Sequence, residues 1–572
     1  VRTAGEFSNG GALTVGQNVD IQAASLTGSR GSVLAAGVKN DGKLAESGDL
    51  RLHADGQLSV HGQTLAGGNL HASGQGVDIS GSRTQGQRVE LDSGAGRLLT
   101  QNAGVNARDL TLRSGQTLNN DGGTLSADAI TLSAQHLSNR KGKLVQTGSG
   151  ALAVNLPGDI DNREGEIAAN GDIQLAAHAV DNRGGKVLAA QGGSLTAQTR
   201  TTLDNRKGTL AAAGNTRIDA GDLNNSEGLI SAATGSGEIR SAQAVSNNKG
   251  RIEAAKTQTI SAAGLDNQQG VIVADGATLA LADGTFNNRF GSLYSHGALN
   301  IHSGALNNQS GYLASGGTLT FKGGAVDNRA GQFAAEQALN ASFGSFLNHE
   351  GSLKALGAMT LRGGTLDNAR GIVGAGGALD VGVTSLDNRQ GTLFSNADAL
   401  LHADRLDNQG GQLAAQRTLS VSVGQLVNDS DGLIQSGGSL TLAADDISNR
   451  SGSIISSAAA TLRSRQLHNG GGEIQSVGDL LIDSGRGIVD NISGLMRSGA
   501  TLTLTAARLI NHNTPGDNQG LEAQNIALAT ETIDNQSGMI LADKSLTVRN
   551  GGELDNRSGG LAASGTVDIR GD

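Results

Sequence analysis

Apolar residues recur along most of the chain as short alternating pairs, and the pattern returns about every 20 residues, a period typical of repeat proteins. We count positions from an asparagine, position 0, which has an apolar residue at −2 in each repeat. Apolar residues then stand at +5, +11, +13 and +18, and small residues are common at +7. In the repeat of Asn308, these positions hold Leu313, Leu319, Phe321, Val326 and, at +7, Ser315. Because side chains two residues apart face the same side of a strand, each pair predicts a short strand with one buried face.

Each repeat is therefore predicted to form two short strands, near +5 to +7 and near +11 to +13, and a third short segment near +18. Glycine at +3 and the Gly, Asp and Asn residues between the pairs are typical of turns. The connections are too short for crossover helices, so the strands can pair only if each turn of chain stacks in parallel on the one before. The pattern thus predicts an all-β parallel β-helix whose neighbouring coils stabilise one another.

The frame divides the chain into two regions. Twenty-two asparagines carry it within residues 118–572, and from Asn288 to Asn428 all seven intervals between them are equal. Residues 1–117 lack the regular asparagine but keep apolar pairs, such as Leu50 with Leu52, at the same period. We therefore expect one continuous rod, with irregular corners in 1–117 and regular corners in 118–572. Roughly 28 coils at ~4.8 Å each would make it on the order of 130 Å long.

The repeated asparagine is interpreted as a structural residue. At a corner, an inward asparagine can bond through its amide to the asparagines of the neighbouring coils and to the turn backbone. A row of ligand-binding amides is the alternative, and it is disfavoured because the asparagine recurs where no other candidate site residue accompanies it. Aspartate at −1 and arginine at +1 flank it in many repeats and predict exposed ion pairs. The column is predicted to include Asn288, Asn308, Asn328, Asn348, Asn368, Asn388 and Asn408.

Composition and charge exclude several classes of protein. The chain has 88 Gly, 2 Pro, no Cys and a net charge of −10. Without a run of Lys or Arg, nucleic acid or an anionic membrane surface is not expected as the main partner. No apolar stretch is long enough for a membrane span. The absence of Cys excludes disulfides and suits a chain that crosses a membrane unfolded. Val1 does not open a signal peptide, so we expect the chain to begin inside a longer protein.

Catalysis is not predicted, and neither is a metal or cofactor. Some β-helix proteins cleave polysaccharides, which requires carboxylates, Arg or His that project together from neighbouring coils. Of the eleven His, only His53, His61 and His71 lie near one another, and outward positions of His53 and His71 favour a solvated surface. No metal-ligand spacing, phosphate loop or nucleophile motif is present.

The aromatic residues give a candidate contact surface. Seven of the eight Phe and both Tyr lie between Phe286 and Phe394. Some of these occupy core positions, but Phe290 at +2, Tyr312 at +4, and Tyr294 and Phe394 at +6 are expected to point outward. Exposed aromatic groups on an aromatic-poor protein indicate contact with a partner chain or receptor. The alternative is chance exposure or local packing beside a turn.

Several repeats carry a family resemblance. LDNRKGTLAAAG (203–214), VDNRGGKVLAAQG (180–192) and LDNRQGTL (386–393) resemble the haemagglutinin repeats of filamentous haemagglutinin-type exoproteins, including the long sticks of contact-dependent growth inhibition toxins. The resemblance is strong over residues 118–572 and loose over 1–117. It implies a right-handed parallel β-helix, export through an outer-membrane two-partner transporter, and a secreted filament at the bacterial cell surface.

Two hypotheses for function follow. The segment is a stalk that extends an adhesin or toxin-delivery protein from the cell, or it binds a receptor on host or neighbouring bacterial cells through its exposed aromatics. The chain also ends in Arg570, Gly571 and Asp572, a tripeptide that some integrins bind; the same position elsewhere holds Leu361, Arg362 and Gly363.

Overall fold

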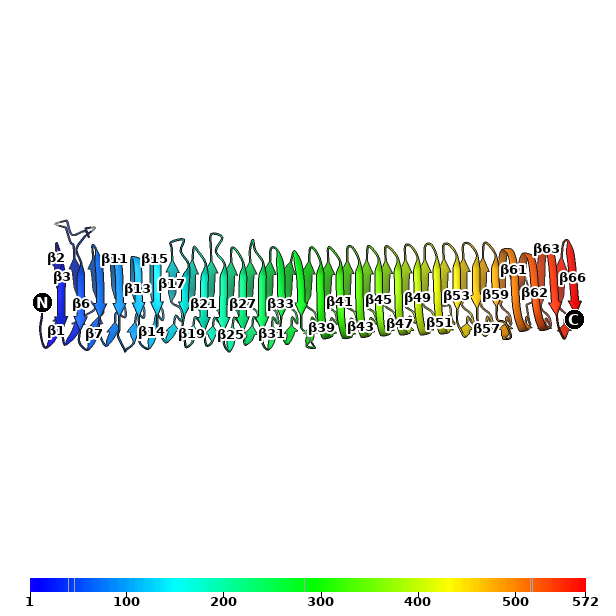
Figure 1. Cartoon of the computed structure of the whole chain (residues 1–572), viewed down its shortest axis with the longest axis horizontal. Coiled ribbons are helices and arrows are strands. Elements are labelled where there is room, and N and C mark those ends of the chain that lie inside the picture. The colour runs from blue at the N-terminus through cyan, green and yellow to red at the C-terminus, as the bar shows by residue number, and fades with distance from the viewer. Residues whose placement is uncertain (40, 46, 282, 515, 517, 572) are drawn as a thin grey trace. The chain divides into compact units, whose positions relative to one another are not determined.

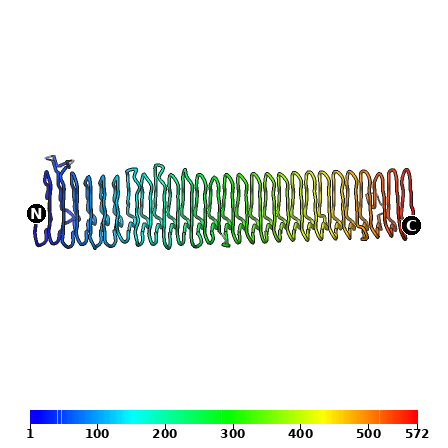
Figure 2. The backbone as a smooth tube through the Cα atoms, in the orientation of Figure 1, coloured from blue at the N-terminus to red at the C-terminus, as the bar shows by residue number. Residues whose placement is uncertain are grey.

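The structure is a computed structural model that describes residues 1–39, 41–45, 47–281, 283–514, 516 and 518–571. It has two compact units: Val1–Asn287 with Gly291–Leu293, and Asn288–Phe290 with Tyr294–Asp572. Within each unit the strands of one coil lie beside those of the next (Figure 1), and the backbone closes one turn per repeat (Figure 2). The strands pair in parallel, which confirms the predicted all-β parallel β-helix. No helix in the described residues is long and apolar enough to cross a membrane.

Most coils of the first unit contain three short strands each, as predicted. The coil of Asn205 is formed by β26 (Thr209–Ala212), β27 (Thr216–Ala220) and β28 (Asp222–Asn224). The next coil supplies their partners, β29 (Leu229–Ala232), β30 (Gly237–Ser241) and β31 (Ala244–Ser246), in parallel register. The apolar side chains of the frame point inward and are buried, because alternate residues of each strand face the core.

In the regular part of the second unit, each coil instead has one short and one long strand. The second and third predicted segments join into one nine-residue strand that continues around the bend. The short strands are β40 (Tyr312–Ser315), β42 (Gln332–Ala335), β44 (Ser352–Ala355), β46 (Ile372–Ala375), β48 (Thr392–Ser395) and β50 (Gln412–Ala415). The long strands are β39 (Leu299–Asn307), β41 (Leu319–Asp327), β43 (Leu339–Leu347), β45 (Met359–Asp367), β47 (Leu379–Asp387), β49 (Ala399–Asp407) and β51 (Leu419–Val427).

In this part of the second unit, the long strands accompany equal coil lengths. Because the coils match residue for residue, Leu299 pairs with Leu319 and Leu319 with Leu339, and no extra residue interrupts the ladder of hydrogen bonds at the bend. Merging also occurs in β11 (Arg83–Asp92), β13 (Gly104–Arg113) and β15 (Thr124–Ser133), and in β61 (Leu495–Ile510), β62 (Gly520–Asp534) and β63 (Met539–Asn550). The division into three separate strands therefore holds only for part of the chain.

Phenylalanines enlarge the core of the second unit. Phe321, Phe333 and Phe346 are almost fully buried, and their rings meet edge to face at centroid distances of 6.5 and 5.5 Å. Phe343, which the frame did not assign to the core, joins them at 5.3 Å from Phe346 and is 5% exposed. Edge-to-face contacts suit the quadrupoles of aromatic rings.

Candidate functional site

The seven asparagines predicted for the column lie in the second unit and are at most 1% exposed. Each Nδ2 donates to Oδ1 of the asparagine one coil later, at 2.7 or 2.8 Å. Asn368 shows the full arrangement, since its Nδ2 also lies 3.3 Å from the carbonyl oxygen of Gly371 and 3.2 Å from that of Thr392. Every donor and acceptor of the buried amide therefore has a partner.

A threonine extends this corner in the first unit. Thr100 Oγ1 donates to Oδ1 of Asn120 at 2.9 Å, so the first asparagine of the series has a donor from the preceding coil. Asn102, two residues after Thr100, has the same left-handed backbone as +2 residues elsewhere, with φ of 53°. The asparagine pattern did not include Thr100. Two signals in the sequence point to it: the apolar Leu98 stands at −2, and Asn120 follows one coil later.

The turn after each asparagine contains a left-handed residue beside the expected glycine. Glycine at +3 was expected as part of the turn, and the positive φ itself lies at +2. It is held there by residues such as Lys207, Glu350 and Gln390, with φ of 57, 55 and 55°. The glycine at +3 is required for space instead: a Cβ on Gly371 would lie 2.2 Å from the carbonyl oxygen of Asn348.

At a second corner, serines at +7 form hydrogen bonds to the preceding coil. Ser315 Oγ donates to the carbonyl oxygen of Gly297 at 2.7 Å, and Ser395 Oγ to that of Gly377 at 2.9 Å, in each case in the preceding coil. The preference for small residues at +7 was visible in the sequence. The bond to the neighbouring coil was not, because it depends on how two turns are stacked.

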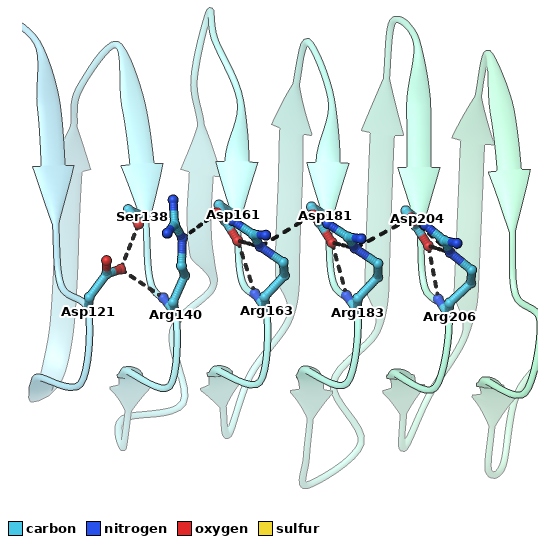
Figure 3. A network of polar contacts seen from close by, with 9 residues as sticks. All are labelled: Asp121, Ser138, Arg140, Asp161, Arg163, Asp181, Arg183, Asp204 and Arg206. Atoms are coloured by element: carbon cyan, nitrogen blue, oxygen red, sulfur yellow. Dashed lines mark hydrogen bonds and ion pairs between the residues drawn. The ribbon is translucent and has the colours of Figure 1, made fainter.

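Aspartates at −1 and arginines at +1 form a continuous surface network in the first unit (Figure 3). Arg163 clamps Asp161 of its own coil through Nε at 2.9 Å and Nη2 at 2.6 Å. Its Nε also lies 3.5 Å from Asp181 of the next coil, where Arg183 repeats the arrangement. The network thus runs across several coils. Two-pronged Arg–carboxylate contacts fix geometry well, but pairs this exposed contribute little to stability individually.

The arginines lower the pKa of their carboxylates. Partial burial alone would raise the pKa of Asp161 and Asp387, but hydrogen bonds from arginine outweigh it, and both pKa values lie below the ordinary 3.8. At Asp327 the hydrogen bond from Arg329 is the largest effect, and it lowers the pKa likewise. The folded chain therefore holds these carboxylates charged at pH values where the unfolded chain already binds protons.

Acid is expected to destabilise the fold. As pH falls through and below the ordinary carboxyl pKa of 3.8, the unfolded state takes up protons first, so unfolding is favoured; above about pH 5 stability should be level. Thermal melts between about pH 6 and pH 2.5 check this. The triple variant Asp161→Asn, Asp327→Asn, Asp387→Asn should show a shallower decline than the wild type. A midpoint that stays constant or rises in acid would contradict the expectation.

The three clustered histidines contact neighbouring coils. His53 Nδ1 lies 2.9 Å from Ser73 Oγ, and His71 Nδ1 lies 3.2 Å from Glu90. His61 Nδ1 lies 2.9 Å from the carbonyl oxygen of Ser80. Burial, followed by the charge of Arg51, lowers the pKa of His71. Three or more His, Cys, Asp or Glu placed to hold a metal ion are not found in the described part of the chain.

Of the four predicted contact residues, two are clearly exposed. Phe290 is 50% exposed and Tyr312 is 39% exposed. Tyr294 is half-buried, with its ring 4.7 Å from that of His296 in an edge contact. Aliphatic residues were missed, because only aromatics were considered: Leu356 and Val477 are 73% and 69% exposed. These two stand singly at turns, which is ordinary for a protein surface.

Phe394 has a local packing role. It is half-buried and pairs with Gly374 on the neighbouring strand, where a Cβ built on the glycine would lie 2.3 Å from Cζ of the ring. The ring therefore covers the space left by the missing side chain. This contact favours the local-packing alternative for Phe394, which also lies five coils away from Tyr294.

The terminal tripeptide is described only in part. Arg570 forms an ion pair with Asp568, Nε to Oδ1 at 3.1 Å. Asp572 lies outside the described residues.

Comparison with known proteins identifies a family and a relative. The Haemagglutinin repeat model matches the chain in twelve overlapping stretches: residues 1–62, 40–104, 88–163, 147–204, 190–248, 232–308, 282–342, 323–400, 374–445, 435–507, 486–520 and 498–572. Toxin CdiA of Yersinia pestis is 35% identical over 162 residues, which cover 28% of this chain and 5% of that protein. The chain thus spans a small part of that relative's length. No solved structure matches.

Proposed function

The chain belongs to the haemagglutinin-repeat family, and from this we propose that it is the stalk of a secreted bacterial surface filament. The stalk extends an adhesin or toxin-delivery protein from the cell and is not itself catalytic. Its full protein leaves the cell through an outer-membrane two-partner transporter. The similarity to Toxin CdiA and the absence of Cys, which leaves the chain free of disulfides during export, support this proposal.

One observation carries the stalk proposal: neighbouring coils of the second unit repeat in length and register. From Asn288 to Asn428 the coils have equal length, and each pairs with the next in the same register. The asparagine contacts also repeat with distances of 2.7 or 2.8 Å. Because each coil interacts with its neighbours alone, a coil can be added or removed without changing the environment of distant coils. The number of coils in such an array sets the length of the stalk, whatever side chains its surface carries.

We further propose that residues 1–117 and 118–572 form one continuous stalk with different corners. The change at Thr100 and Asn120, where a hydroxyl takes the place of the amide, supports this boundary. We assign the column Asn288–Asn408 a structural role, because each amide is already satisfied by its neighbours and has no free donor to offer a ligand.

The test varies coil number in the full-length exported protein. Versions with no copy, one copy or two copies of residues 308–427 should all reach the cell surface. A gold-labelled tag placed after the segment should stand ~30 Å further out with each copy, from six coils at ~4.8 Å. Cryo-electron tomography measures this height. Deleting residues 308–317, half a coil, should abolish display, because it breaks the register.

Equal tag heights in all three versions would contradict the stalk proposal. Loss of surface display on removal of whole coils would contradict it as well, because interchangeable coils predict normal folding.

A further inference from the structure

Phe290 places an aromatic side chain on the left-handed +2 position, where no other described coil has an aromatic residue. Its φ is 54°, in the left-handed region, where a bulky non-glycine residue is an outlier. Other coils place charged, polar or small residues at this +2 position, such as Glu227, Ser310 and Ala330. Half of the Phe290 surface is nevertheless exposed to solvent. The left-handed turn itself belongs to the fold, but an exposed aromatic ring is not needed for it, since other coils form the same turn with polar or small residues, and such a ring therefore marks a candidate contact surface.

A cationic side chain lies over this ring, and further aromatic residues stand on the same coil and the next one. The guanidinium carbon of Arg289 lies 4.7 Å from the centroid of Phe290. Hydrogen bonds join the backbone around Phe290 to the next coil. Asn288 Nδ2 donates to the carbonyl oxygen of Tyr312 at 3.3 Å, and Phe290 N donates to the carbonyl oxygen of Gln309 at 3.1 Å. Tyr294 and His296 lie on the same coil as Phe290. We call Arg289, Phe290, Tyr294, His296 and Tyr312 the Phe290 surface.

The two coils that carry the Phe290 surface combine aromatic residues with an absence of carboxylates. Residues 182–203 and 449–468 also lack Asp and Glu, but they carry no Phe or Tyr. The whole chain carries −10, yet no Asp or Glu occurs between Asp283 and Asp327. The next carboxylate along the second unit, Asp327, is clamped by Arg329 at 2.6 Å. The two coils that carry the Phe290 surface therefore contribute positive charge and no negative charge. A ligand that carries carboxylates would meet attraction from the positive charge of these two coils.

We propose that the Phe290 surface binds an acidic segment of a protein partner, with apolar side chains of that segment packing on Phe290 and Tyr312. Phe, Tyr and Arg are the residue types that dominate the energetics of protein interfaces, and a rigid aromatic side chain loses little entropy on binding. The hydrogen-bonded corner fixes the backbone that carries the two rings before the partner arrives, which lowers the cost of binding. This inference is independent of the stalk proposal, because a stalk of any length carries the surface.

The test uses a random peptide library displayed on phage, with the whole chain as bait. Enriched peptides should combine Asp or Glu with Leu, Phe or Trp. Their dissociation constants should rise at least about tenfold for the variant Phe290→Gly with Tyr312→Ser, which removes both rings. Glycine is the residue best suited to the left-handed backbone, so the variant should fold as well as the wild type. Binding should also weaken as salt is raised.

A matched control lies further along the second unit. Gln390 occupies the +2 position with φ of 55°, and the carbonyl oxygen of Gln412 accepts from Asn388 at 3.0 Å, as that of Tyr312 does from Asn288. The variant Gln390→Gly with Gln412→Ser should bind the peptides like the wild type. Phe394→Ser should do so too, because that ring covers Gly374.

Three outcomes would overturn the proposal. These are the failure to enrich acidic peptides, equal binding by the wild type and the Phe290→Gly, Tyr312→Ser variant, and equal loss of binding in the Gln390→Gly, Gln412→Ser control. Vesicles of phosphatidylglycerol that displace the peptides and bind the wild type more tightly would assign the surface to lipid instead, and would also overturn it.

Discussion

Replacing Asn368 with aspartate is expected to destabilise its part of the fold by about 3 to 5 kcal/mol at pH 7, the cost of a buried charge without a partner. In the wild type, Asn368 Nδ2 faces Asn388 Oδ1 at 2.7 Å and the carbonyl oxygens of Gly371 and Thr392 at 3.3 and 3.2 Å. In the variant a carboxylate oxygen would face three acceptors with no proton between them. The site is fully buried, so water cannot compensate.

The destabilisation should depend on pH in a defined direction. The surrounding acceptors favour the protonated form, so the pKa of the introduced carboxyl group in the folded state would be raised above its unfolded value of about 3.9. The full loss of stability is then present above the pKa that the introduced carboxyl group has in the folded state. The loss shrinks as pH falls through that pKa, because the protonated group can donate to Asn388. The difference between wild type and variant should therefore be larger at pH 7 than at about pH 5, before general acid unfolding begins.

Hydrogen–deuterium exchange measures this locally. Peptides from the coils of Asn348 to Asn408 should exchange faster in Asn368→Asp, and peptides around Asn205 should not change, because each coil interacts only with its neighbours. Asn340→Asp is the control, since Asn340 is exposed on β43 and the change there should be nearly neutral. Equal effects at both positions would show that the column does not stabilise the corner.

Replacing Gly371 with alanine is expected to destabilise the same coil by about 3 kcal/mol or more, through overpacking. The added Cβ would lie 2.2 Å from the carbonyl oxygen of Asn348, 2.6 Å from Oδ1 of Asn368 and 2.9 Å from Nδ2 of Asn348. All three atoms belong to the asparagine corner, where the hydrogen bonds leave little room to move. Relief therefore requires two coils to separate, which breaks the backbone pairing between them.

Gly104→Ala is the matched control for the packing argument. Gly104 also lies in the solenoid, in β13, but a Cβ built on it meets nothing within 4 Å. Alanine there should change stability by less than about 1 kcal/mol, with stabilisation expected because glycine loses more entropy on folding. Thermal midpoints of the two variants should differ by several degrees. Similar midpoints would mean that the glycine at +3 is not fixed by close packing.

Much of the fold could be predicted from the sequence because it repeats. The spacing of Leu299, Leu319 and Leu339 fixes which residues stack, and the same spacing places the asparagines on one column. A short, constant period, together with alternating apolar and polar positions, left few architectures open. Features that depend on one coil alone could therefore be predicted, such as Leu side chains that point inward and Asp and Arg side chains that point outward.

Contacts between coils were less visible. Long strands such as β45 depend on unbroken pairing around a bend, and the packing of Phe394 on Gly374 depends on which residues lie across the sheet. The positive φ at +2 was also hidden, because residues as different as Lys207 and Phe290 adopt it. Glycine at +3 indicated a turn, but the sequence did not show that this glycine allows close approach of the neighbouring asparagine while the +2 residue adopts the left-handed conformation.

Small-angle X-ray scattering of the purified chain and of a version lacking residues 308–427 tests most directly whether the coils are interchangeable units of length. Removing six coils should shorten the maximum dimension by ~30 Å at ~4.8 Å per coil, while the cross-sectional radius of gyration stays the same. An unchanged maximum dimension, or a cross-section that shrinks with the deletion, would contradict the account, because the removed residues would then not have contributed length by stacking.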